Sequence, residues 1–217
     1  MPDFFEQVVI NLKNTSLLEA IAVIAGIVSV WFSRKENIWV YPTGLINTII
    51  YIYLSLKAQL VGEASVNFYY TVMSVYGWWL WAKRDQAQKP VVRITFSNKK
   101  EWIQEVIFFL FFYVTLFFIL TFLKQRHFPN AIPWADAFAS ATAYTGMWLM
   151  ARKKVESWWW WIATNIASIP LYYSKGYAFT SVYYIVLLVM AVFGLLEWMK
   201  RARQYRNSKS NFEFETR

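Results

Sequence analysis

Apolar residues along this chain gather into seven long blocks that have no charged residue at their centres. Each block has about the length at which a helix rising 1.5 Å per residue crosses a hydrocarbon core roughly 30 Å thick. The pattern therefore predicts an all-α integral membrane protein. The seven predicted transmembrane helices are residues 17–33, 38–56, 65–82, 102–123, 135–151, 156–173 and 178–199.

Two segments differ from the other predicted helices. Residues 135–151 are rich in Ala, Ser and Thr, the small residues that let a helix pack closely on protein, so we expect this helix to be surrounded by protein. Residues 4–12 have apolar side chains on one face of a short helix, which predicts a segment on the membrane surface. Nothing at the start of the chain has the pattern of a cleavable signal peptide.

The first three predicted helices share ordered landmarks with the last three. Arg34-Lys35, Asn47 and Lys57 recur at one constant offset as Arg152-Lys153, Asn165 and Lys175, and Gly77, Trp81 and Lys83-Arg84 recur one residue of shift later as Gly194, Trp198 and Lys200-Arg201. An odd helix between two copies lets the second copy insert the same way up. The landmarks therefore predict two parallel three-helix bundles joined by a linker helix (3+1+3).

This architecture divides the chain into five segments. They are an N-terminal surface segment (1–16), a first three-helix bundle (17–84), a basic cytoplasmic loop with linker helix four (85–134), a second three-helix bundle (135–201) and a basic cytoplasmic tail (202–217). We expect the tail to be disordered and to lie near anionic lipid headgroups.

The net charge of +9 is explained first by membrane topology and not by nucleic acid. With seven crossings, 17 of the 22 lysines and arginines fall on the side that holds the C-terminus. Because cytoplasmic loops carry the excess of basic residues, we expect the N-terminus outside and the C-terminus in the cytoplasm.

Composition leaves little equipment for catalysis. The chain has no cysteine and one histidine, His127, so disulfides, thiol nucleophiles and most zinc sites are excluded. No Walker loop is present, and Glu19, Glu105 and Glu197 lie near helix ends, which disfavours ATP-driven and ion-coupled transport. We therefore expect no enzyme activity, no metal and no cofactor.

Amides are the polar groups that lie deepest in the predicted helices. Asn47 and Asn165 take equivalent places in the repeat, and an amide in hydrocarbon needs a partner. Two alternatives stay open for them, a hydrogen bond between helices or contact with a ligand. Asn67 and Tyr70 mark a polar face of the third helix, and the repeat counterpart of Asn67 is Tyr184.

Aromatic residues form the other candidate site. Trp158 and Trp161 lie on the same helix face as Asn165, and in the second helix the corresponding stripe is Trp39, Thr43, Asn47 and Tyr51. Indole pairs leading to an amide suit a flat ring with hydroxyl groups attached, through stacking and hydrogen bonds. By contrast, we assign Trp79, Trp159 and Trp198 to an interfacial belt.

The run from Trp39 to Asn47 (WVYPTGLIN), the W-x-x-W that leads to Asn165, and the 3+1+3 duplication together resemble the PnuC family of bacterial nicotinamide riboside transporters. The resemblance covers residues 17–201. It implies a design similar to that of the SWEET transporters, facilitated diffusion without ions or ATP, and a multi-pass protein of the bacterial inner membrane. It also implies a homotrimer and a cytoplasmic kinase that traps the riboside.

The candidate site fits this ligand, because indole and phenol faces attract a pyridinium cation. We assign Trp158 and Trp161 to stacking, Asn47 and Asn165 to polar contacts, and Tyr51, Asn67, Tyr70 and Tyr184 to the lining. One alternative is the same fold with another vitamin, such as thiamine, or a sugar as its substrate. Another is a membrane enzyme or a scaffold.

Overall fold

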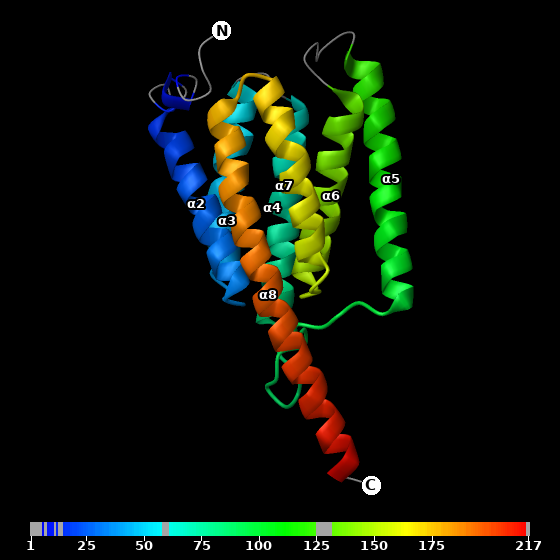
Figure 1. The fold of residues 1–217 in the computed structure, drawn as a ribbon. Coiled ribbons are helices and arrows are strands. Elements are labelled where there is room, and N and C mark those ends of the chain that lie inside the picture. Colours follow the sequence, from blue (N-terminus) through cyan, green and yellow to red (C-terminus); the bar gives the residue numbers. More distant parts are fainter. Residues whose placement is uncertain are drawn as a thin grey trace.

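The computed structural model describes residues 6, 8–10, 12, 15–57, 61–124 and 132–215, and within these ranges its regular structure is helical (Figure 1). The long helices are α2 (Leu17–Arg34), α3 (Val40–Lys57), α4 (Val61–Ala82), α5 (Lys99–Lys124), α6 (Pro133–Ala151), α7 (Ser157–Ser174) and α8 (Ala178–Glu215). The all-α prediction is confirmed. Part of the predicted surface segment 1–16, and His127, lie outside the described residues.

Three stretches of the described helices are long and apolar enough to cross a membrane, namely Leu17–Arg34, Lys99–Lys124 and Ala178–Ser208 within α8. In α5 none of the residues of the most apolar stretch is buried, which leaves that stretch open to lipid. In α6, by contrast, 11 of 19 residues are buried, most of them Ala, Thr or Gly. The expectation that this small-residue helix packs on protein is confirmed.

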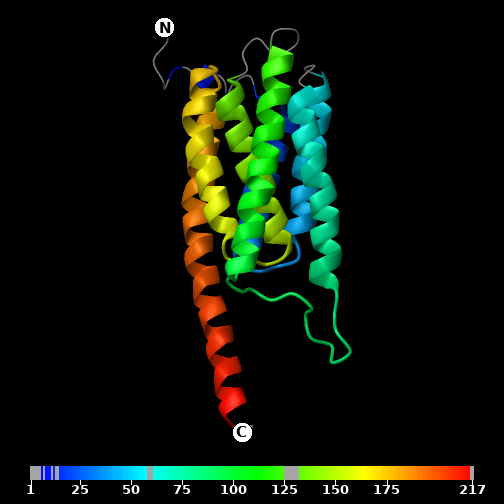
Figure 2. The same cartoon turned by 90° about the vertical axis from the view of Figure 1, so that its right-hand side faces the viewer.

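The helices pack in two groups of consecutive neighbours. α2 packs on α3 and α3 on α4, while α6 packs on α7 and α7 on α8. The groups meet along two seams, α4 on α6 and α2 on α8. α5 packs on α6 and stands at the side of the molecule, as two views at right angles show (Figure 1 and Figure 2).

The hydrophobic core lies at the end of the bundle that holds the turn between α2 and α3 and the turn between α6 and α7, which we call the core end. There Tyr41 packs edge-on against Trp81, with ring centroids 5.2 Å apart. The Tyr41 ring also lies directly on Gly77, where a Cβ would come within 2.4 Å of the Tyr41 Oη. Any larger residue at position 77 would therefore displace this ring.

The second group of helices repeats this packing. Trp158 packs edge-on against Trp198 with centroids 5.6 Å apart, and its ring lies on Gly194, where a Cβ would come within 2.4 Å of the Trp158 Cη2. These three positions follow those of the first group at one constant offset in sequence. Trp198 is wholly buried, so its assignment to an interfacial belt is wrong. Its ring fills the core between the two groups.

Two tryptophan side chains donate hydrogen bonds between the groups at the core end, one along each seam. The Trp81 Nε1 donates to the Ala151 carbonyl at 3.0 Å, and the Trp198 Nε1 donates to the Ser33 carbonyl at 3.1 Å. Each tryptophan thus binds the last turn of the first helix of the other group. We call this pair of bonds the tryptophan latch.

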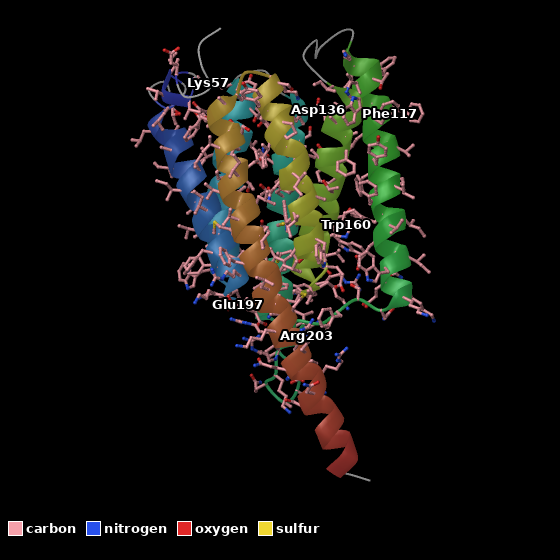
Figure 3. The ribbon with its side chains drawn as sticks, viewed as in Figure 1. Lys57, Phe117, Asp136, Trp160, Glu197 and Arg203 are labelled. Atoms are coloured by element: carbon pink, nitrogen blue, oxygen red, sulfur yellow. The ribbon has the colours of Figure 1, made fainter. Side chains whose placement is uncertain are left out.

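Ion pairs surround the latch. Glu36 and Lys153 end α2 and α6 in the left-handed region, with φ of 58° and 54°, and their side chains pair at 2.7 Å. Glu197 pairs with Arg34 at 2.8 Å and with Arg201 at 2.6 Å, and Arg201 also reaches Glu36 at 3.3 Å. Glu197 lies at the core end of the bundle (Figure 3). In this structure the core end is closed.

The basic tail is not disordered as expected, because α8 continues as one helix to Glu215 and extends well beyond the bundle (Figure 2). Ala202 is 2% exposed, so the first turn beyond the bundle packs on the loop between α4 and α5. The Arg93 guanidinium of that loop lies over the Tyr205 ring, 5.1 Å from its centroid. These contacts stabilise the extension of α8 beyond the bundle, a segment for which composition alone predicts disorder.

Candidate functional site

One face of α7 carries a stripe that runs from the core end toward the opposite end. Its members are Trp158, Trp161, Asn165, Ser168 and Tyr172, and their alternating spacing of three and four residues keeps them on one side of a helix. Trp158, Asn165 and Ser168 are each no more than 3% exposed. The inward face of α7 thus changes from indole to amide to hydroxyl along its length.

The two tryptophans of this stripe have different surroundings. Trp158 lies in the closed core against Trp198, and its buried Nε1 has no hydrogen-bond partner among the described residues. Trp161 lies one turn further in, against Gly146, where a Cβ would be 3.2 Å from the indole Cε2. Its ring centroid is 6.1 Å from that of Tyr70. Trp161 therefore marks the boundary between the core and the polar interior.

The two repeat-related asparagines also differ. The Asn47 Nδ2 donates to the Ala22 carbonyl at 2.7 Å, so this amide joins α3 to α2. Asn165 is 3% exposed as a residue, and its amide makes no hydrogen bond with another described residue. An amide in the interior of a membrane protein needs a hydrogen-bond partner, because its desolvation is otherwise not repaid. Of the two alternatives left open by the sequence, Asn47 takes the bond between helices, and Asn165 remains available to a ligand.

α4 presents a stripe with the same alternating spacing, which includes Glu63, Asn67, Tyr70, Gly77 and Trp81. Asn67 is 9% exposed, and its Nδ2 donates to the Glu63 carbonyl at 3.0 Å. Tyr70 contacts α7 through Trp161, as described above. The α4 stripe therefore runs from a carboxylate at the opposite end to the Trp81 of the latch.

Tyrosines of α7 and α8 complete the interior. Tyr184 stacks on Tyr172 with centroids 5.1 Å apart and planes 21° from parallel. The neighbouring Tyr183 points its hydroxyl at Gly26, where a Cβ would lie 2.4 Å from the Tyr183 Oη and 2.8 Å from the Asn47 Nδ2. Gly26 thus makes room for a phenol and an amide to meet between α2, α3 and α8.

The predicted stripe of α3 is not brought together. Trp39 precedes the helix and is 59% exposed, and the Thr43 hydroxyl donates to the Trp39 carbonyl at 2.7 Å. Tyr51, two turns beyond Thr43 on α3, is half-buried. The reason is geometric, because each step of four residues advances about 40° beyond a full turn. Three such steps carry Trp39 about a third of a turn away from Tyr51.

Several residues of the interior were not identified by the sequence analysis. They are Gly26, Tyr144, Gly146, Tyr172 and Tyr183. Tyr172 had a signal, since it follows Asn165 by seven residues on the same face of α7. Gly26 and Gly146 had none, because only the close approach of a ring from another helix gives them their role.

The interior offers stacking faces, hydroxyl groups and amides, and its stripes carry a charge only at the end opposite the core. Among the described residues no group of three or more His, Asp or Glu side chains could hold a metal ion. Such an arrangement is suited to a flat ligand with polar substituents, through stacking and hydrogen bonds.

The profile of a family described as nicotinamide mononucleotide transporter matches residues 16–200. PnuC of Escherichia coli, a nicotinamide riboside transporter, is 24% identical over 211 residues and covers 88% of each chain. RibM of Streptomyces davaonensis, a riboflavin/roseoflavin transporter, is 21% identical over 182 residues, which is 83% of this chain and 84% of RibM. The crystal structure of the vitamin B3 transporter PnuC has a TM-score of 0.71 at 24% identity and covers 93% of this chain and 88% of that one, a likeness of fold.

Proposed function

This chain belongs to the nicotinamide mononucleotide transporter family, and on that premise we propose that it imports nicotinamide riboside across the bacterial inner membrane. The observation that carries the proposal is Asn165, a residue 3% exposed whose amide has no partner among the described residues, on the same face of α7 as Trp161. The riboside brings a carboxamide, ribose hydroxyls and a flat pyridinium ring. An amide matches the first two, and an indole face matches the third.

We assign Trp161 and Tyr70 to the pyridinium ring and Asn165 to the carboxamide or ribose. The lining of the same interior comprises Asn47, Asn67, Tyr51 and Tyr184. In a conformation in which the core end is open, we expect the substrate to contact Trp158, Trp39 and Thr43. The stripes described above carry no lysine or arginine along the interior. A phosphate would need such a partner, which favours the riboside over its mononucleotide.

We further propose that α2–α4 and α6–α8 are the two copies of a duplicated bundle and that α5 is their linker. The repeated packing of Tyr41, Gly77 and Trp81 in the other group, and the symmetrical tryptophan latch, support this 3+1+3 architecture. Transport is then a rocking of the two bundles around a central site. Opening toward the core end requires the latch to break.

The core end is the cytoplasmic end in this account. It carries the basic turns after α2 and α6 and the basic extension of α8, as the excess of positive charge on the cytoplasmic side requires. The N-terminus then lies outside. Facilitated diffusion does not by itself accumulate the riboside, so a downstream kinase must trap it inside the cell. From the family resemblance we also propose that the protein is a homotrimer.

Riboflavin is the second candidate substrate, because the relative RibM is named for it. Its isoalloxazine ring is also flat and is followed by hydroxyl groups, so the same indoles and amides suit it. It has no fixed positive charge and a much larger ring. The two candidates are therefore separated by size and by charge.

Binding tests this proposal directly. Titration of the purified protein with nicotinamide riboside, followed by tryptophan emission, is expected to show saturable quenching, whereas nicotinamide, ribose, thiamine and glucose have little effect. Asn165→Ala is expected to weaken binding at least about tenfold, because the carboxamide loses its partner. Asn47→Ala should instead lower the thermal stability through the lost bond to Ala22. Quenching by riboflavin alone, or unchanged binding in Asn165→Ala, would contradict the proposal.

A further inference from the structure

A cavity of about 320 Å³ lies at the core end, between the extension of α8 and the loop that joins α4 to α5. Cavities of this size hold small molecules. It is separate from the interior described above, whose stripes carry no lysine or arginine, because two of its six lining residues are arginines. The lining consists of Glu36, Pro90, Arg93, Ile94, Arg201 and Tyr205.

The loop wall of this cavity is held in place by the rest of the protein. The Thr95 amide donates to the Lys153 carbonyl at 3.2 Å, which joins the loop to the turn between α6 and α7. Ile94 is 3% exposed and belongs to the same core cluster as Ala202 of α8. Arg93 directly precedes these two anchored residues, so its backbone position is set before any ligand binds.

Arg93 is a half-buried cation without an anionic partner. Its guanidinium lies over the Tyr205 ring, 5.1 Å from the centroid, and makes no ion pair or hydrogen bond with another described residue. A guanidinium presents its N–H donors as a planar fork that matches the oxygens of a phosphate or a carboxylate. The fork of Arg93 therefore has no acceptor within the described part of the chain.

Arg201, on the other side of the cavity, is positioned by neighbouring oxygens. Its Nη1 donates to the Lys35 carbonyl at 3.2 Å and to the Glu36 Oε2 at 3.3 Å, and its Nη2 donates to the Glu197 Oε1 at 2.6 Å. These bonds use three of its five N–H groups and leave two for a ligand. The other Glu36 oxygen is paired with Lys153 at 2.7 Å, so the carboxylate in the lining is already neutralised.

Positive charge is in surplus around the cavity. The ion pairs at its rim and the lining together hold two carboxylates and four basic side chains. They are Glu36 and Glu197, and Arg34, Arg93, Lys153 and Arg201. A cavity lined by one sign of charge attracts the opposite ion, so an anion is the ligand that this place favours.

We propose that this cavity binds a phosphomonoester, with the phosphate between Arg93 and Arg201 and the rest of the ligand on Pro90 and Tyr205. A phosphomonoester has three acceptor oxygens and a charge of about −2, which matches two guanidinium groups that approach from two sides. Two sources supply this group, a soluble nucleotide and the headgroup of phosphatidic acid. The site lies outside the proposed transport pathway and does not depend on which substrate the protein carries.

The first arm of the test uses a soluble ligand with and without its phosphate. Full-length protein in phosphatidylcholine nanodiscs is titrated with adenosine monophosphate and with adenosine, and binding is followed by calorimetry. We expect saturable binding of the monophosphate and none of adenosine. Arg93→Gln should weaken the monophosphate at least about tenfold, because a charge-assisted pair is lost.

Arg203→Gln is the matched control, since it removes the same charge from α8 close to the cavity. Arg203 is exposed and lies two residues after Arg201, on roughly the opposite side of the helix (Figure 3). It should leave binding unchanged. Because Arg93 makes no ion pair, Arg93→Gln should also keep the melting temperature of the ligand-free protein, which separates lost binding from lost folding.

The second arm adds phosphatidic acid to the nanodiscs in the absence of nucleotide. A melting temperature that rises in the wild type and in Arg203→Gln but not in Arg93→Gln identifies the lipid headgroup as a ligand, and binding in the first arm identifies the soluble one. Either result supports the inference. No effect of either ligand, or equal effects in Arg93→Gln and Arg203→Gln, would overturn it. No measurement here involves transport, so the proposed function stands or falls separately.

Discussion

At the scale of single residues, glycine decides where the aromatic rings lie. Gly194 is in close contact with the Trp158 ring, and Gly77 is in equivalent contact with Tyr41. At each of these two positions, any residue larger than glycine would have a side chain that keeps the ring out of the core end. The two contacts occupy equivalent positions, so they impose the same closed packing on both groups of helices.

The variant Gly194→Ala tests this role. The new Cβ would lie 2.4 Å from the Trp158 Cη2, so the ring must move, and we expect a loss of stability of about 1–3 kcal/mol. Gly44→Ala is the matched control in α3, since its nearest neighbour is the Ser29 hydroxyl, 3.1 Å away, which needs to shift by only a few tenths of an ångström. Apparent melting temperatures in detergent compare the two. Equal melting temperatures for Gly194→Ala and the wild type would contradict the packing described here.

At the scale of the helices, the same heptad-like spacing organises α4 and α7. In α7 the sequence showed this stripe because Trp158, Trp161 and Asn165 stand at steps of three and four residues. In α3 the predicted stripe instead has repeated steps of four, a direction that winds around the helix and leads to the exposed Trp39. Residue spacing therefore predicts a helix face only when the steps keep to one side of the helix.

The tryptophan latch is the element-level feature that the transport cycle must break. The chain has no cysteine, so Val155→Cys, at a site 1% exposed in the closed core, gives a single reporter of opening. We expect Trp81→Phe and Trp198→Phe each to speed maleimide labelling of this reporter about fivefold, the effect of one hydrogen bond of about 1 kcal/mol.

The double variant should label faster than either single variant, because the two bonds lie on different seams. Trp159→Phe serves as the control, since Trp159 is 53% exposed and takes no part in the latch. Labelling rates that do not change in the latch variants would show that the core end opens by another route.

At the scale of the whole molecule, the sequence predicted the helices far better than the contacts between them. Apolar blocks revealed the all-α class, and a block of small residues correctly indicated that α6 is enclosed by protein. Burial of Trp198 and the continuation of α8 to Glu215 were missed. Both depend on surfaces supplied by distant segments, and neither a tryptophan near a helix end nor a basic tail reveals such a partner.

The whole molecule is a multi-pass membrane transporter of a known family, and its proposed substrate and energetics can be tested together. Uptake of labelled nicotinamide riboside into proteoliposomes without ATP or an ion gradient tests both at once. We expect saturable uptake that stops when the inner and outer concentrations are equal, and faster exchange when the vesicles are preloaded with unlabelled riboside. Uptake only under an imposed ion gradient, or uptake of riboflavin and not of the riboside, would contradict the account.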